Sequence, residues 1–173
     1  MCYAWMMGAA KLGMHFVAMG PEELAKQMDK DVVNSTFAEA RENGGLIEIT
    51  DNKADLKGAD VIYGDVWASM GEEAQIPERV RLLSPFRVTE ETLKATENPD
   101  VLYLHCLPAD ITGLSCPEGE VDNSVFDRYI VPLYKQASYK PYIIAAMIFM
   151  SQVKDPVRTL MAMDEGNGKR KSF

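Results

Sequence analysis

Short, strongly apolar segments alternate with longer helical ones, and this alternation limits the fold more than any other feature of the chain. The short runs read "MHFVAMG", "LIEIT", "ADVIYGDVW" and "DVLYLHC". Runs this short and this continuously apolar are typical of strands covered on both faces, as in a parallel sheet between two layers of helices. The sequence therefore predicts an α/β fold with a doubly wound, mostly parallel, Rossmann-like sheet.

The helical segments complete this prediction. They are expected at residues 3–12, 21–45, 52–57, 77–83, 89–97, 139–153 and 155–163. The chain opens in a helix, whereas a doubly wound domain opens in a strand, so we expect a sheet that lacks its first strand. We expect one domain over residues 1–163, followed by a frayed polar tail over residues 164–173.

Composition excludes several classes of protein. A formal net charge of -8 argues against nucleic acid or an anionic membrane as the main partner. No run of 18 or more uncharged apolar residues occurs, so no membrane span is expected, and residues 1–19 do not read as a signal peptide. The cysteines, Cys2, Cys106 and Cys116, include no CxxC pair. We therefore expect no disulfide framework and no metal site, and a reducing cytoplasm as the location.

The first chemically loaded motif, "HCLPAD", follows an apolar strand. His105 and Cys106 are adjacent, and alternation along a strand would send their side chains to opposite faces, which disfavours a nucleophile–base pair. A buried cysteine acting as a small apolar residue is the simplest interpretation. Pro108 cannot continue a β-ladder, so the carbonyl groups of Cys106 and Leu107 are expected to remain free for a ligand.

The second motif, "GDVWASMGEE", follows another strand. Asp65 either caps a turn or a helix, or holds the ammonium group of a substrate by a charge-assisted hydrogen bond. In the second case Ser69, Met70 and Gly71 would form a loop that closes over the substrate. Both motifs fall at carboxyl ends of strands, where doubly wound sheets bind their ligands.

Two lysines precede an apolar helix near the end of the chain, which we expect to be buried. Lys140 flanks the start of that helix, where Pro141 suits the first turn. Lys135 lies earlier and is either a surface lysine or a cation that reaches a phosphate or carbonyl oxygen.

Taken together, "AAKLGMHFVAMGPEEL", "GADVIYGDVWASMGEE" and "LYLHCLPAD" resemble the amino-acid-binding half of the ornithine transcarbamylase family, over roughly residues 6–153. The resemblance implies that Asp65 binds the α-amino group of the substrate and that Ser69 and Met70 belong to a closing loop. It implies that Cys106 and Leu107 offer main-chain carbonyls near the attacking amine. His105 and Pro108 would belong to the same substrate-binding strand end.

The family transfers a carbamoyl group from carbamoyl phosphate to an amine, without a metal or organic cofactor. Its S-T-R-T-R and H-P-x-Q motifs, which bind carbamoyl phosphate in a separate N-terminal domain, do not occur in this sequence. Lys135 stands where the family has an arginine that contacts carbamoyl phosphate, and a lysine lacks the planar fork of arginine. Asp110 stands where many relatives are basic. These departures suggest an uncharacterised branch related to the ornithine and acetylornithine enzymes.

The resemblance thus implies the second-substrate domain of a carbamoyltransferase that binds an amino acid or diamine and is inactive as an isolated chain. Its partners would be copies of itself, as in the trimers of the family, or a complementing N-terminal chain. The alternative is a binding or assembly module that keeps this domain fold without catalysis.

Overall fold

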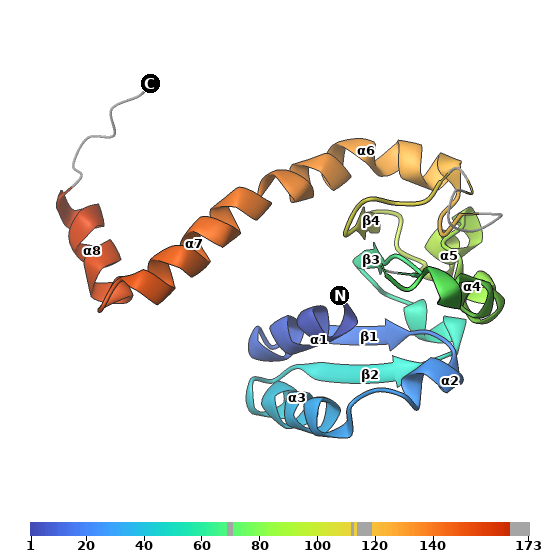
Figure 1. Ribbon diagram of the computed structural model, residues 1–173, viewed down its shortest axis with the longest axis horizontal. Helices are drawn as coiled ribbons and strands as arrows, with labels where there is room; N and C mark the ends of the chain where they lie inside the picture. Colours follow the sequence, from blue (N-terminus) through green and yellow to red (C-terminus); the bar gives the residue numbers. More distant parts are fainter. Residues whose placement is uncertain (69–70, 112, 114–118, 167–173) are drawn as a thin grey trace. The chain divides into compact units, whose positions relative to one another are not determined.

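The computed structural model describes residues 1–68, 71–111, 113 and 119–166, and it forms two units, Met1–Leu133 and Tyr134–Phe173 (Figure 1). In chain order its elements are α1 (Cys2–Lys11), β1 (His15–Met19), α2 (Glu22–Ala25), α3 (Lys30–Glu42), β2 (Leu46–Thr50), η1 (Lys53–Leu56), β3 (Val61–Gly64), η2 (Glu73–Gln75), α4 (Ile76–Leu83), η3 (Ser84–Phe86), α5 (Glu90–Ala95), β4 (Leu102–His105), α6 (Asn123–Ser138), α7 (Lys140–Gln152) and α8 (Pro156–Gly166). The predicted α/β alternation is confirmed.

The strands form two parallel pairs. β1 pairs with β2, from His15 opposite Leu46 to Met19 opposite Thr50. β3 pairs with β4, from Val61 opposite Leu102 to Gly64 opposite His105. No ladder joins the two pairs among the described residues. In the doubly wound strand order, one further strand lies between the positions that β1 and β3 occupy, so the two pairs correspond to the two halves of such a sheet.

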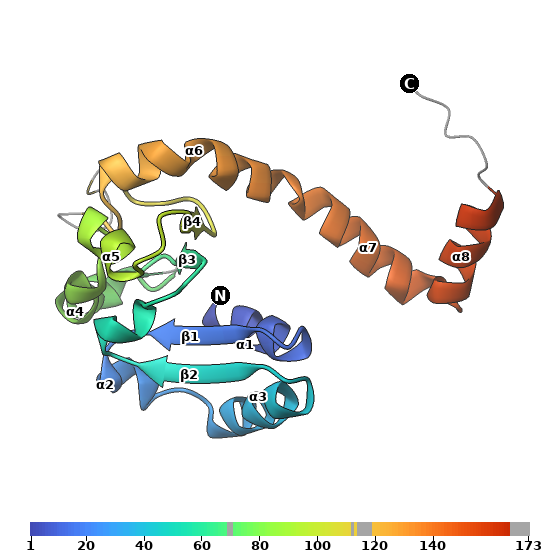
Figure 2. The ribbon, with the colours of Figure 1, turned by 180° about the vertical axis from the view of Figure 1, so that it is seen from behind.

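Small residues allow α1 and α3 to approach the first strand pair closely (Figure 2). Met6, Ala9 and Ala10 of α1 meet Ala40 of α3 and Ile47 of β2 in one buried cluster. Alanine at three of these positions brings the helix backbones near the strands, which is how a helical layer covers a parallel sheet.

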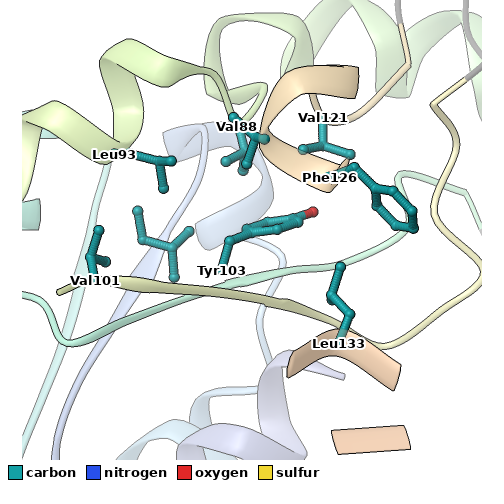
Figure 3. Close-up of a cluster of buried hydrophobic side chains, with 9 residues drawn as sticks. Val88, Leu93, Val101, Tyr103, Val121, Phe126 and Leu133 are labelled. Carbon is teal, nitrogen blue, oxygen red and sulfur yellow. The ribbon is translucent and has the colours of Figure 1, made fainter. Parts of the chain in front are cut away.

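A second buried cluster supports the strand ends of the other pair (Figure 3). Tyr103 of β4 lies at its centre with no exposed surface, and Figure 3 shows side chains from α5, α6 and the connecting loops around it. The cluster consists of Ile62, Val88, Leu93, Val101, Tyr103, Val121, Val125, Phe126 and Leu133. An isolated parallel strand pair is only marginally stable, so this packing fixes β3 and β4 in place.

The helix predicted over residues 21–45 is wrong in one respect, because the structure has two helices there. The first ends at Ala25, and Asp29 caps the second: its carboxylate accepts hydrogen bonds from the backbone N–H groups of Asp31 and Val32, at 2.9 and 3.1 Å. The extended backbone of an N-cap cannot continue a helix, so the segment divides into α2 and α3.

Two further expectations about the C-terminal part are corrected. Residues 123–138 form helix α6, which the sequence did not predict, with Pro132 inside it. Helix α7 was expected to be buried, yet none of its residues is buried, and Tyr142 is 72% exposed. A helix buries its apolar face only against another layer, and the described residues of the second unit, 134–166, contain none that covers α7. Among the described residues, no helix is both long and apolar enough to span a membrane.

Gly64 is required where β3 and β4 meet, and its replacement tests the close packing there. A Cβ atom at this position would lie 2.6 Å from the hydroxyl oxygen of Tyr103 and 2.7 Å from Cδ2 of His105. Both side chains are fully buried and cannot move aside, so Gly64→Ala should lower the free energy of unfolding in urea by about 1–3 kcal/mol.

The matched control is Gly8→Ala in α1, where nothing lies within 4 Å of the new Cβ atom. That variant should be more stable by about 0.5–1 kcal/mol, because alanine favours helices over glycine. Equal stability of the two variants would contradict the packing described for Gly64.

Candidate functional site

The chemically loaded residues gather where β3 and β4 end. Because the strands are parallel and Gly64 lies opposite His105, the next residues, Asp65 and Cys106, emerge side by side at the carboxyl edge. The Cys106 thiol donates a hydrogen bond to Oδ1 of Asp65 at 3.2 Å. The same oxygen accepts the backbone N–H of Val66 at 3.0 Å. The two motifs are therefore brought together, as the fold prediction required.

The second oxygen of Asp65 faces a primary ammonium group. The amino nitrogen of Met1 lies 3.3 Å from Oδ2, and the side chain of Asp65 is 39% exposed. Among the described residues, the only backbone N–H that the Asp65 side chain accepts is that of Val66, and Asp65 caps none of the described helices. The carboxylate is thus held by one oxygen and presents the other to a cation.

Cys106 is kept in its thiol form. Burial chiefly, together with the hydrogen bond to Asp65, raises the pKa of the Cys106 thiol from 9.0 to about 11. The protonated sulfur is a poor nucleophile. Its observed role is to donate to Asp65, which links the end of β4 to the end of β3.

His105 is buried, and both of its ring nitrogens face protein groups. Nδ1 accepts the backbone N–H of Leu107 at 2.9 Å. Nε2 lies 3.0 Å from Oε1 of Glu120, in an electrostatic contact whose angle is not that of a regular hydrogen bond. Because Nδ1 accepts a hydrogen bond, the proton of the imidazole ring lies on Nε2, facing Glu120.

The expectation that His105 and Cys106 point apart is wrong. Sγ of Cys106 lies 3.8 Å from Nδ1 of His105, because β4 ends at His105 and strand alternation no longer applies at the next residue. The inference drawn from it still agrees with the structure. The thiol donates to Asp65 and Nδ1 accepts from Leu107, so the two side chains do not form a nucleophile–base pair.

The main chain turns sharply after Cys106. Leu107 has a φ of 53°, and the Leu107–Pro108 peptide bond is cis. Within the described part of the chain, no hydrogen bond is made to the carbonyl oxygens of Cys106 and Leu107. No described residue therefore occupies these two acceptors, and their part in binding a ligand stays a prediction.

The structure does not test the remaining predicted site residues. Ser69 and Met70 lie outside the described residues, as does Cys116. Lys135 is exposed in the last turn of α6, within the second unit. Its part in the site stays a prediction. No group of three or more metal-ligating side chains occurs in the residues that the structure describes.

Sequence reasoning missed Glu120, which the structure places under the site with only 6% of its surface exposed. It contacts the loops that follow both strands. In the sequence "CPEGEVD" it resembles a surface glutamate. It is buried because its backbone pairs with that of Asp110, ten residues earlier in the chain. No local signal could have identified it.

Comparison with known proteins shows what this chain is similar to. Residues 1–151 match the family described as aspartate/ornithine carbamoyltransferase, Asp/Orn binding domain. The catabolic ornithine carbamoyltransferase of Clostridium perfringens is 49% identical over 111 residues, which cover 63% of this chain and 33% of that protein.

Solved structures agree with the sequence match. The anabolic ornithine carbamoyltransferase from Campylobacter jejuni aligns with a TM-score of 0.75 and 26% identity, over 86% of this chain and 46% of that one. The enzyme from Pyrococcus furiosus aligns with a TM-score of 0.71 and 33% identity, over 88% and 47%. The chain spans between a third and a half of the length of these relatives. The predicted resemblance and fold class are confirmed.

The raised pKa of Cys106 predicts slow alkylation of this thiol. A rise from 9.0 to about 11 lowers the thiolate fraction near pH 8 about a hundredfold, so iodoacetamide should label Cys106 about a hundredfold more slowly in the folded chain than in urea. Peptide mass spectrometry over pH 7–10 would give the rates. Asp65→Asn should speed the labelling of the folded chain, because it weakens one cause of the shift.

The same shift fixes the sign of a stability effect. The unfolded thiol, with the lower pKa, loses its proton first as pH rises. The stability that Cys106 contributes is therefore full below pH 9 and is lost between pH 9 and about 11.

For the labelling experiment, equal rates of Cys106 alkylation in the folded chain and in urea would contradict the protected thiol.

Proposed function

The chain belongs to the aspartate/ornithine carbamoyltransferase family, as its Asp/Orn binding domain, and from that membership we propose that it binds the amine substrate of a carbamoyl transfer. The substrate is an amino acid or diamine of the ornithine type. The identity of 49% with a catabolic ornithine carbamoyltransferase supports this substrate class.

One observation carries the proposal, namely the arrangement at the ends of β3 and β4. A partly exposed carboxylate, Asp65, follows β3, and two backbone carbonyls to which no described residue donates a hydrogen bond, those of Cys106 and Leu107, follow the neighbouring strand β4. A carboxylate binds an α-ammonium by charge-assisted hydrogen bonds, and amine hydrogens are what free carbonyls accept.

The reaction assigned to this site is the attack of a neutral amine on the carbonyl carbon of carbamoyl phosphate. A C–N bond forms, the bond from that carbon to the phosphate oxygen breaks, phosphate leaves with the bonding electrons, and the amine nitrogen loses a proton. The carbonyls of Cys106 and Leu107 would orient the attacking nitrogen through its hydrogens. Asp65 would hold the α-ammonium away from the reaction.

Carbamoyl transfer also requires cations on the departing phosphate, and Asp65, Cys106 and Leu107 supply none. We propose that Lys135 and a domain bearing the carbamoyl phosphate site provide them in the complete enzyme, and that this chain alone is inactive. The complete enzyme would use carbamoyl phosphate as co-substrate, no metal or organic cofactor, and a homo-oligomeric assembly or a complementing N-terminal chain. The few cysteines suit a cytoplasmic location.

Loss of the Asp65 charge should weaken amine binding. Isothermal titration of the chain with ornithine, acetylornithine, putrescine and 2,3-diaminopropionate would identify the ligand, and Asp65→Asn should weaken its binding about tenfold or more, since hydrogen bonds to charged groups contribute about 1.5–3 kcal/mol. Asp51→Asn is the matched control, because Asp51 is an exposed aspartate that also follows a strand. Equal weakening by both variants would refute the role of Asp65.

A phosphate-release assay then separates the two candidate functions. Carbamoyl phosphate and the same amines are incubated with the chain, with and without the N-terminal half of a related carbamoyltransferase. Release only with the added half is the expected result. Silence in both arms, from a folded chain, would favour a binding or assembly module.

A further inference from the structure

We infer that Glu120 is the positioning residue of this site, whose carboxylate holds the ends of β3 and β4 at a fixed separation. The expected effect of Glu120 on amine binding rests on the proposed function. The structural part of the inference stands on contacts that do not involve any substrate. The side chain of Glu120 is 5% exposed, so it neither meets solvent nor offers itself as a ligand-binding group.

One oxygen of Glu120 holds the loop that follows β3. Oε2 accepts the backbone N–H of Trp67 at 3.3 Å, across 53 positions of sequence. Trp67 is two residues beyond Asp65, so this bond sets where the chain goes after the carboxylate that faces the ammonium. Val66 is itself tied to Asp65 by its N–H, which leaves little freedom between the two points.

The other oxygen holds the loop that follows β4. Oε1 accepts the backbone N–H of Asp110 at 2.9 Å and lies 3.0 Å from Nε2 of His105. His105 in turn fixes the position of Leu107, because Nδ1 of His105 accepts the backbone N–H of Leu107 at 2.9 Å. The turn that presents the carbonyls of Cys106 and Leu107 is therefore fixed on both sides.

The backbone of Glu120 is anchored firmly enough to serve as this support. Its N–H donates to the carbonyl of Asp110 at 3.0 Å, and its own carbonyl accepts the N–H of Val88 at 3.1 Å. Gly119, with a φ of +71°, allows the close approach, since a Cβ atom there would lie 2.5 Å from the Asp110 carbonyl oxygen. The carboxylate is thus carried on a rigid base.

Only a carboxylate satisfies all of these donors. Both of its oxygens accept, whereas a glutamine amide has one accepting oxygen and one NH₂ group that only donates. In Glu120→Gln, the oxygen can face Asp110 and His105, but the NH₂ group then opposes the N–H of Trp67. This variant should release the β3 side selectively and leave the β4 side in place.

The test compares the wild-type chain with Glu120→Gln and with Glu42→Gln, an exposed glutamate of α3 for which no side-chain contact is described. Hydrogen exchange followed by NMR reports the amides of Trp67 and Asp110, and titration with ornithine reports affinity. Both are measured where thermal unfolding curves show all three proteins folded, because a loss of stability alone does not change the affinity of the folded protein.

We expect the Trp67 amide of Glu120→Gln to exchange at least tenfold faster, the Asp110 amide to keep its protection, and ornithine to bind at least tenfold more weakly. Glu42→Gln should match the wild type in all three. Unchanged exchange of Trp67, or unchanged affinity despite faster exchange, would overturn the inference.

The failure of the proposed function gives a different pattern. If the wild-type chain binds none of the amines, that function is wrong and the exchange data decide alone. Faster exchange at Trp67 in Glu120→Gln would then still support the coupling of the two strand ends, and unchanged exchange would overturn it.

Discussion

The parallel pairing of β3 with β4 is the constraint on which the site depends. The register that sets Gly64 opposite His105 makes the next residue of each strand, Asp65 and Cys106, neighbours, although 41 positions separate them. A shift of one residue would turn the side chains of one strand to the other face and separate the thiol from the carboxylate. Gly64 protects this register, because only a residue without a Cβ atom fits against Tyr103 and His105.

Much of this arrangement is visible in the sequence, since it depends on local patterns. Short apolar runs indicate the strands, and the proline at position 108 indicates the turn after Cys106, where no described residue donates to the carbonyls of Cys106 and Leu107. What failed depends on contacts distant in sequence. The cap at Asp29 divided an apparently continuous helix, and α6 formed around Pro132 because Val125, Phe126 and Leu133 pack into the Tyr103 cluster. Packing of this kind overrides local propensity.

Glu120 marks the same limit at the level of chemistry. A glutamate between a glycine and a valine has no feature that distinguishes it from a solvated one, and charged side chains are rarely buried unless they are paired. Its burial follows from the return of the chain beside Asp110. Its importance to the site follows from the two backbone N–H groups it accepts, from the loops after β3 and β4, and from its contact with His105 of β4. Sequence patterns identify the residues that contact a ligand more readily than they identify the residues that position them.

The charge of the site connects these observations. Desolvation is the main reason that the Cys106 thiol resists ionisation, and the charges of Asp65 and Glu120 add to it. The carboxylates of Asp65 and Glu120 make the potential at the ends of the strands negative. That potential favours an ammonium beside Asp65 and disfavours a phosphate dianion at the same place. The same negative potential keeps a nearby ammonium protonated, whereas the attacking amine must be neutral. The attacking nitrogen is thus better served by uncharged acceptors, such as the carbonyls of Cys106 and Leu107, than by a carboxylate, and the cations that hold the phosphate must come from another part of the enzyme.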